Sequence, residues 1–313
     1  MKAIVKYGEL PGEVDLREIE EPACADNEVK IEVRACAICV TDLHIIAGEY
    51  PWEVGVPLGH EFCGVVVEVG KNVKEFSVGE RVVSCMNGGF ARYVVKDESD
   101  WVFHLPDEIS YYEGALLEPL AAAANSVIKR SLIRPADHVL IEGPGVIGLF
   151  VLQVCKLFNA HVMITGTRSD KKRLELAKSF GADKALTVED SDILNEAKTF
   201  SRGKGIDTVF ECSGSQAALD TGLQVLKYDG QLTQVGIFGR NASIDLGQLV
   251  YNNRKIIGSI AYDRSMWERV IRMVQVGQVN VKAMISEVLP LDEWERGFRM
   301  AKERSGLRII LVP

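Results

Sequence analysis

A glycine-rich loop between an apolar run and a helical pattern is the feature of this sequence that most restricts its fold. The pattern G-x-G-x-x-G is fitted by Gly143, Pro144, Gly145, Val146, Ile147 and Gly148. The run 138–142 before the loop is typical of a buried parallel strand, and the run 149–158 after it is typical of a buried helix. Glycines in such a loop let the backbone approach a pyrophosphate, which then lies at the helix N-terminus. The sequence therefore predicts an α/β fold in which these six residues contact a dinucleotide.

The rest of this part of the chain alternates between strand and helix patterns. Six candidate strands begin near His138, His161, Lys184, Asp207, Gln231 and Lys255. That number and spacing are typical of a doubly wound parallel sheet. We expect residues 122–262 to form a Rossmann dinucleotide-binding domain.

The first third of the chain has a different pattern. Short β-rich runs alternate with Gly, Pro and Asn turns up to about residue 110, and between them only residues 41–47 suggest a helix. We expect a β-rich domain over residues 1–121 and a helix over 111–129 that leads into the second domain. The segment 263–313 is too short for a domain of its own, so we expect it to complete the first.

The composition excludes several classes of function. The 36 basic and 44 acidic residues give a net charge of −8, which argues against a nonspecific nucleic-acid binder and against a binder of anionic membranes. No apolar run is long enough to span a membrane and no signal-peptide core is present, so we expect a cytoplasmic protein. The 7 cysteines are scattered, which favours reduced thiols over a disulfide framework.

A second set of chemistry-bearing residues lies in the β-rich part. Cys39, His60 and Glu61 supply a thiolate, an imidazole and a carboxylate, and Thr41 adds a hydroxyl. Catalytic zinc takes three such ligands and leaves a fourth position open. Each residue alone has an ordinary alternative, since a lone Cys is more often a small buried hydrophobe. Glu118 lies in an apolar context, where a carboxylate would be costly unless a metal, or a water on it, offset the burial.

Taken together, these residues resemble the zinc-dependent medium-chain alcohol and polyol dehydrogenase family, which includes sorbitol and threonine dehydrogenases. The matching stretches follow the family's order and comprise residues 39–44, 59–61, 79–82, 114–120, the glycine loop and 207–214. The resemblance implies a GroES-like catalytic domain, a Rossmann domain and one catalytic Zn²⁺ per chain. It implies hydride transfer between a secondary alcohol or polyol and NAD(P). A threonine-type or simple secondary-alcohol dehydrogenase is an alternative, and an NADP(H)-sensing binding protein is an alternative outside the enzymes.

The resemblance also implies a role for each site residue. Cys39 and His60 would bind zinc, with Glu61 or Glu118 as the third ligand, depending on what else is bound. Thr41 and then His44 would take the proton from the alcohol, and Glu61 is counted with them among the catalytic residues. The other interpretation of Thr41 is an N-cap for a helix over residues 42–47, and both roles can hold together.

The end of the second Rossmann strand bears on the choice of cofactor. An NAD enzyme would usually place Asp or Glu there, whereas residues 166–168 are Gly-Thr-Arg. A hydroxyl and a guanidinium suit a 2′-phosphate, so Thr167 and Arg168 favour NADP. NAD stays possible as the cofactor, because Asp170 could be the acidic residue that contacts the ribose. The alternative is that neither residue contacts a cofactor, with Arg168 a solvated charge in the turn and Asp170 a helix N-cap. Further expected cofactor contacts are Cys212, Val235 and Ile260.

One departure from the family concerns a lobe of about thirty residues with four cysteines on a structural zinc, which members commonly carry just after the stretch 79–82. Here Val83 is followed by Ser-Cys-Met-Asn-Gly-Gly, with no cysteine cluster. Either the chain lacks the lobe, or a stretch of the natural chain is missing from the sequence near Cys85 and Met86; as written, it cannot form a four-Cys site. The resemblance further implies a homodimer or homotetramer through the edge strand near residues 255–260, and a small alcohol or ketone as substrate.

Overall fold

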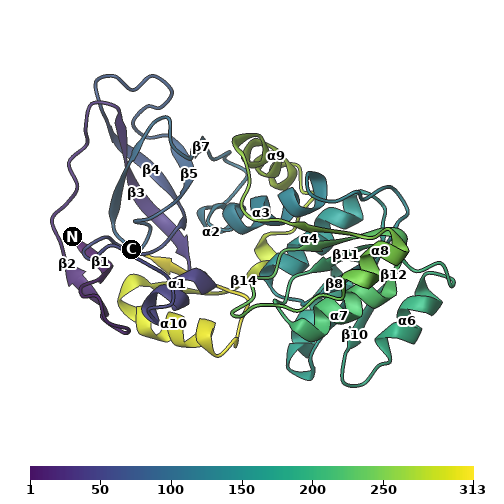
Figure 1. The fold of residues 1–313 in the computed structure, drawn as a ribbon. Helices are drawn as coiled ribbons and strands as arrows, with labels where there is room; N and C mark the ends of the chain where they lie inside the picture. The colour runs from purple at the N-terminus through teal and green to yellow at the C-terminus, as the bar shows by residue number, and fades with distance from the viewer. The chain divides into compact units, whose positions relative to one another are not determined.

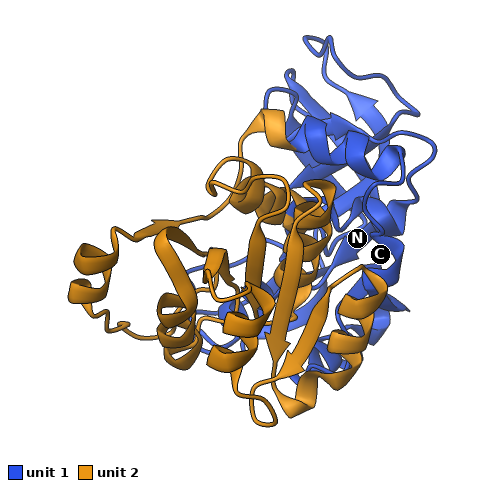
Figure 2. Cartoon of the chain, turned by 90° about the vertical axis from the view of Figure 1, so that its right-hand side faces the viewer, with its two compact units in different colours: residues 1–118, 267–313 blue, residues 119–266 orange.

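The computed structural model describes residues 1–313, and the chain divides into two compact units. Unit 1 comprises residues 1–118 and 267–313, and unit 2 comprises residues 119–266 (Figure 2). The chain therefore starts in unit 1, builds unit 2 and returns to unit 1. None of its helices is both long and apolar enough to cross a bilayer.

Unit 1 is built on a seven-stranded sheet in the order β14-β15-β3-β4-β5-β7, with β6 paired to β3. Figure 1 labels β3, β4, β5, β7 and β14 of this sheet. Its strands are β3 (Glu28–Ala37), β4 (Glu61–Val69), β5 (Arg81–Cys85), β6 (Tyr93–Asp97), β7 (Val102–His104), β14 (Ile285–Pro290) and β15 (Arg308–Val312). A separate antiparallel pair is formed by β1 (Lys2–Lys6) and β2 (Val14–Glu18). The predicted β-rich first domain is confirmed.

The segment that returns from unit 2 becomes part of this sheet. β15 pairs antiparallel with β3, with Ile310 opposite Ala37 and Leu311 opposite Cys36, and β14 pairs parallel with β15. Ile310 and Leu311 are fully buried, which accounts for the apolar run at this point of the sequence. The helices that accompany the sheet are α1 (Val40–Ile46), α2 (Tyr111–Gly114) and α10 (Trp294–Lys302).

The connection after β5 is short. β5 ends at Cys85, and the chain turns through Met86, whose φ is 70°, and Gly88, whose φ is 111°, before β6 begins at Tyr93. Left-handed backbone suits glycine, and at Met86 it is uncommon. No lobe interrupts the path from β5 to β6.

Unit 2 is a six-stranded sheet in which every pair is parallel, in the order β10-β9-β8-β11-β12-β13. Its strands are β8 (His138–Glu142), β9 (His161–Gly166), β10 (Lys184–Thr187), β11 (Ile206–Glu211), β12 (Leu226–Gln234) and β13 (Lys255–Gly258). Counted from β8, this is the order 3-2-1-4-5-6 of the dinucleotide-binding fold. The six predicted strands and the doubly wound sheet are confirmed.

The helices of unit 2 connect these strands. They are α4 (Val146–Leu157), η1 (Arg168–Asp170), α5 (Lys171–Ser179), α6 (Ile193–Phe200), α7 (Gln216–Val225) and α8 (Leu246–Asn252). α3 (Leu117–Ile128) and α9 (Arg264–Gln275) cross the two boundaries between the units. β8 is buried except at His138, and α4 is buried over residues 148–155, which explains why these stretches are largely apolar.

Two predicted elements differ from the structure. The single helix expected over 111–129 is two helices, because Ser110 caps α2 and accepts a hydrogen bond from Glu113 N, and the chain then turns at Ala115 and Leu116 before α3. The fifth strand begins at Leu226, five residues before the expected start at Gln231, because Leu226 pairs with Ile206 ahead of a shift in register.

Candidate functional site

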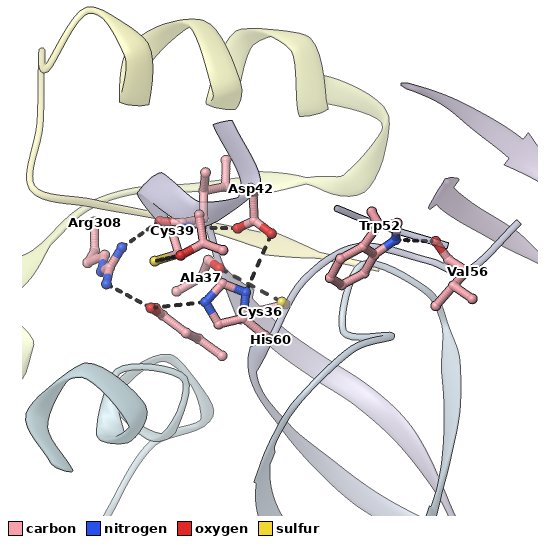
Figure 3. Close-up of polar contacts among 11 residues, drawn as sticks. Cys36, Ala37, Cys39, Asp42, Trp52, Val56, His60 and Arg308 are labelled. Atoms are coloured by element: carbon pink, nitrogen blue, oxygen red, sulfur yellow. Dashed lines mark hydrogen bonds and ion pairs between the residues drawn. The ribbon is translucent and has the colours of Figure 1, made fainter. Parts of the chain in front are cut away.

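Three ligand-type side chains converge at one end of the sheet in unit 1. Cys39 follows β3, while His60 lies just before β4 and Glu61 is its first residue. β3 and β4 are antiparallel neighbours, with Cys36 opposite Phe62, so the end of one strand lies beside the start of the other. The Cys39 sulfur, a ring nitrogen of His60 and a Glu61 oxygen all lie within 4.8 Å of one another. Figure 3 shows Cys39 and His60 in this cluster.

The start of α1 fixes two of these groups through Asp42. Asp42 is fully buried, and its Oδ2 accepts a hydrogen bond from the Cys39 backbone N at 2.8 Å. Its Oδ1 lies 3.6 Å from His60 Nδ1, and a dashed line in Figure 3 marks this ion pair. The N-cap of α1 is Cys39, so the prediction of Thr41 as the N-cap is wrong. The Thr41 hydroxyl instead lies 3.6 Å from the Cys39 sulfur.

Arg308, the first residue of β15, is a member of this cluster that the sequence analysis missed. Its Nη2 donates to Glu61 Oε1 at 2.7 Å, and its Nη1 donates to the Ile38 carbonyl at 2.8 Å. Both Arg308 and Glu61 are buried. A signal existed, since a charged residue at the start of a buried apolar strand requires a buried partner.

The charges in this cluster shift one another's pKa values. Burial raises the pKa of the Cys39 thiol, but the positive charges of Arg308 and His60 outweigh it and bring that pKa to about 6. Burial lowers the pKa of His60, but the polar contacts of its ring with Asp42 and with the Cys39 sulfur, and the negative charges of both, raise that pKa to about 12. Burial raises the pKa of Glu61 well above its usual range even though Arg308 opposes the shift. Cys39 is therefore prepared to act as a thiolate.

The cluster has the properties of a metal site. Glu61 Oε2 and Asp42 Oδ1 are buried oxygens without a hydrogen-bond partner, which is costly in the absence of a compensating charge. A thiolate, an imidazole and a carboxylate are the donors that catalytic zinc takes. These residues fit zinc.

Glu118 and His44 lie at the margin of the cluster. Glu118, the second residue of α3, is half-buried and close enough to raise the pKa of Glu61, but it is not one of the three converging ligands. His44 is one helical turn beyond Thr41, and its Nδ1 lies 2.5 Å from Glu49 Oε2 on the exposed side of α1.

The glycine loop of unit 2 is shaped for close approach to a ligand. Gly143 has a φ of 104°, and Gly145 is the N-cap of α4. A methyl group added at Gly145 would contact no atom within 4 Å, so the backbone there is open. A Cβ at Gly148 would lie 2.0 Å from the Gly143 carbonyl, so this glycine is required by packing. Open backbone at a helix N-terminus fits a dinucleotide pyrophosphate.

The predicted ribose-binding turn lies beside this loop. A Cβ at Gly166 would be 2.7 Å from the Pro144 ring, so the end of β9 is next to the glycine loop. Thr167 donates to Asp170 Oδ2 from its backbone N at 3.0 Å and from its hydroxyl at 2.8 Å. Arg168 is a largely exposed turn charge, as the alternative has it, and it is also ion-paired, because its Nε donates to Asp190 Oδ1 at 3.0 Å. Asp170 holds the N-cap position of α5 but makes no side-chain bond to that helix.

The other expected cofactor contacts follow the carboxyl ends of neighbouring strands, the edge at which α/β sheets bind ligands. Cys212 follows β11, and its N donates to the Glu142 carbonyl at 2.9 Å. Val235 follows β12, and Ile260, which is exposed, comes two residues after β13.

Comparison with known proteins decides what the two units are. The family of alcohol dehydrogenase GroES-like domains matches residues 25–107, and the zinc-binding dehydrogenase family matches residues 146–276. A sorbitol dehydrogenase of Halalkalibacterium halodurans is 31% identical over an alignment that covers 100% of this chain and 99% of the relative. The chain belongs to the zinc-dependent medium-chain alcohol and polyol dehydrogenases. It is an NAD(P)-dependent enzyme of that family.

Other similar proteins are also dehydrogenases. A D-arabitol-phosphate dehydrogenase of Enterococcus avium is 31% identical and covers 99% of this chain and 97% of its own. The crystal structure of 2R,3R-butanediol dehydrogenase from Bacillus subtilis superposes with a TM-score of 0.91 at 30% identity, covering 100% of this chain and 99% of that one. A zinc-binding dehydrogenase from Sinorhizobium meliloti, solved bound to NADP, superposes with a TM-score of 0.91 at 26% identity, with coverage of 100% and 99%.

The chain is shorter than its alignment with the sorbitol dehydrogenase. The alignment with the sorbitol dehydrogenase extends over 343 positions, whereas this chain has 313 residues. The alignment therefore contains at least 30 positions (343 − 313) that have no residue in this chain. All seven cysteines of the dehydrogenase are free, and Cys85, at the point where the lobe would start, is buried.

Two buried glutamates at the carboxyl edge of the unit 2 sheet were not identified from the sequence. Glu142 on β8 and Glu211 on β11 are register partners on adjacent strands. Glu211 accepts hydrogen bonds from the backbone N of Ser213 and Gly214, at 2.7 and 3.0 Å, and from Gln234. Glu142 Oε2 has no partner, and burial together with the charge of Glu211 raises the pKa of Glu142 well above its usual range. One buried carboxyl of the pair therefore keeps its proton.

Proposed function

We propose that the dehydrogenase oxidises a secondary hydroxyl of a polyol, and reduces the corresponding ketone, at a zinc held by Cys39, His60 and Glu61. The convergence of these three ligands within 4.8 Å carries the proposal. Glu118 at the margin is a fourth candidate ligand, whose carboxylate would replace that of Glu61 when substrate binds. The sorbitol and D-arabitol-phosphate dehydrogenases among its relatives support a polyol as substrate.

Asp42 and Arg308 hold the ligands in position. Asp42 accepts from Cys39 N and lies beside His60 Nδ1, so it fixes the ligand loop relative to the imidazole. Arg308 holds one oxygen of Glu61 and leaves the other free to bind. A zinc ion in this position supplies Lewis acidity, which lowers the pKa of the substrate hydroxyl.

Thr41 and His44 offer a path for the substrate proton. The Thr41 hydroxyl lies 3.6 Å from the Cys39 sulfur, so it is next to the position where a substrate hydroxyl would meet the ligands. His44 is one turn further along the helix and exposed, so it can pass a proton to water. The dinucleotide, whose pyrophosphate the glycine loop of unit 2 would hold, would supply the hydride acceptor.

NADP is the cofactor that we propose. Arg168 follows Gly166 and Thr167 at the end of β9, and a guanidinium there can pair with a 2′-phosphate. Asp170, the candidate partner for the ribose hydroxyls of NAD, is already engaged by Thr167 and lies 3.5 Å from Arg173. Both observations favour NADP, and a comparison of the two cofactors tests the choice.

The test is zinc analysis and turnover of the wild type, of Cys39→Ser and of a matched control, Cys24→Ser. The Cys24 sulfur donates to a backbone carbonyl at 3.1 Å, as a serine hydroxyl can. We expect one zinc per chain and NADP reduction with polyols in the wild type and the control. In Cys39→Ser we expect loss of zinc and at least a hundredfold lower turnover, on the order expected when a zinc ligand is removed. A zinc-free wild type that oxidises NADPH with a quinone would overturn the proposal.

Threonine is the second candidate substrate. An L-threonine 3-dehydrogenase of Legionella pneumophila is 31% identical and covers 99% of this chain. Threonine and simple secondary alcohols therefore belong in the substrate panel with the polyols. Binding of NADPH and zinc without turnover of any alcohol would favour a sensing protein instead.

We also propose a cytoplasmic homodimer or homotetramer. β13 is the edge strand of the unit 2 sheet, and the exposed side chains near it include Val250, Tyr251 and Ile260. An exposed edge with apolar neighbours favours pairing with a second copy. The molar mass from light scattering on the same sample tests this, and a monomer at micromolar concentration would exclude it.

A further inference from the structure

The ribose-binding turn of unit 2 meets two acidic side chains from a different loop. Glu189 and Asp190 follow β10, the strand next to β9 in the sheet. The Val188 N donates to the Gly166 carbonyl at 2.9 Å, which holds the two loops together. Arg168 therefore lies against residues that the pattern at the end of β9 alone does not reveal.

Both acids bind Arg168. The guanidinium donates to Asp190 Oδ1 from Nε at 3.0 Å and from Nη2 at 2.5 Å. The Arg168 backbone N donates to the Glu189 carboxylate at 3.0 and 3.2 Å. The hydrogen bond from Arg168 also lowers the pKa of Asp190, so this carboxylate is ionised at neutral pH. The guanidinium of Arg168 is therefore already paired with Asp190 before a cofactor binds.

The consequence differs between the two cofactors. NADP(H) brings a 2′-phosphate with a charge of about −1.5 to −2 at neutral pH, and NAD(H) brings a neutral hydroxyl. Arg168 and Asp190 are both largely exposed, and such a pair contributes little to stability, so Arg168 can leave Asp190 for a phosphate. Asp190 then remains as a negative charge close to that phosphate. A carboxylate in this position repels the 2′-phosphate and so weakens the binding of NADP(H). It leaves the binding of NAD(H) unchanged, because the 2′-hydroxyl is neutral.

We propose that Asp190 is a specificity-determining residue that limits the preference of this dehydrogenase for NADP(H) over NAD(H), by pairing with Arg168 and by repelling the 2′-phosphate. The inference rests on the proposed binding of the adenosine ribose beside Thr167 and Arg168. It does not require that NADP be the preferred cofactor, because it concerns the ratio of the two affinities.

The test is direct binding of NADPH and NADH to the purified zinc-loaded enzyme, followed by nicotinamide fluorescence at low and high salt. The variants are Asp190→Asn, Arg168→Gln and a matched control, Asp229→Asn. Asp229 is a comparably exposed aspartate in an ion pair with Lys255, and its substitution makes the same charge change at a place away from the β9 turn. Thermal unfolding and zinc content verify that each variant is folded.

We expect Asp190→Asn to bind NADPH about three- to tenfold more tightly than the wild type, with NADH affinity changed less than about twofold. The gain should shrink at high salt, because exposed charges are screened. Asp229→Asn should change neither affinity, and Arg168→Gln should weaken NADPH selectively.

An unchanged ratio of NADPH to NADH affinity in Asp190→Asn would overturn the inference, and so would equal tightening of both cofactors. A wild type that prefers NADH would count against NADP as the proposed cofactor, whereas a shifted ratio in Asp190→Asn would still support the role of Asp190. The two failures are therefore distinguishable.

Discussion

At the scale of single residues, Arg308 controls how Glu61 can act as a ligand. Its two-armed contact with Glu61 and the Ile38 carbonyl lies in a buried environment, where removing one partner of an ion pair is strongly destabilising. We expect Arg308→Met to lower the free energy of unfolding by about 3–5 kcal/mol and to weaken zinc binding by about 10- to 100-fold.

Arg308→Lys separates charge from geometry. A lysine keeps the positive charge but cannot reach both acceptors in the same fork, so we expect an intermediate loss. Denaturant unfolding and competition with a zinc chelator measure the two effects. If Arg308→Met bound zinc as tightly as the wild type, Arg308 would have no part in holding Glu61.

Glu142 gives the stability of unit 2 a specific pH dependence. Its pKa is raised in the folded state by burial and by Glu211, so folding favours the protonated form. This stability is complete below the ordinary glutamate pKa of 4.5 and is lost as the pH rises through the folded-state pKa. A glutamine at position 142 would have nearly the same shape as glutamate but would stay neutral at every pH.

We therefore expect Glu142→Gln to be more stable than the wild type at pH 8 by about 1 kcal/mol or more, with the difference vanishing near pH 4. Thermal unfolding across this pH range measures it. Glu175→Gln, an exposed glutamate paired with Lys178, is the control and should change stability little. A constant difference at all pH values would show that ionisation of Glu142 is not the cause.

At the scale of elements, the first turn of α1 connects helix capping to metal binding. Asp42 accepts from the Cys39 N and lies beside His60, so one side chain serves the helix and the ligands. We expect Asp42→Ala to cost about 1–2 kcal/mol of stability and to reduce zinc affinity at least tenfold.

The matched control is Asp192→Ala at the N-cap of α6, where the side chain accepts from the Asn195 N at 3.2 Å. It should lose about 1 kcal/mol of stability and no zinc affinity. Equal zinc affinity in the two variants would mean that Asp42 acts only as a cap. Equilibrium dialysis against a zinc buffer provides the comparison.

The elements also show which features the sequence could predict. β8, β9 and β11 were predictable because each carries its own buried apolar run, and the glycine loop was predictable because close packing fixes its residue types. The division into α2 and α3 was not, because it depends on a cap at Ser110 inside a continuous helical pattern. Cys39, His60 and Glu61 were identified as a set, whereas Arg308 was missed because its partner is 247 residues away in sequence.

At the scale of the whole molecule, the division of the chain separates two chemical tasks. The converging ligands and Arg308 all belong to unit 1, and the glycine loop and the β9 turn belong to unit 2. The sequence indicated this division through the change from β-rich runs to alternating strands and helices. It did not reveal the pairing of Arg168 with Asp190, because neighbouring loops in a parallel sheet come from distant segments.

The pairing of β15 with β3 has a consequence for the time at which the enzyme becomes competent. During synthesis the ribosome releases Cys39, His60 and Glu61 early, while Arg308 emerges only after all of unit 2. Until β15 pairs with β3, Glu61 therefore lacks the guanidinium that holds its Oε1. The pairing of β15 with β3, rather than the pairing of β3 with β4, therefore completes the contacts around Glu61.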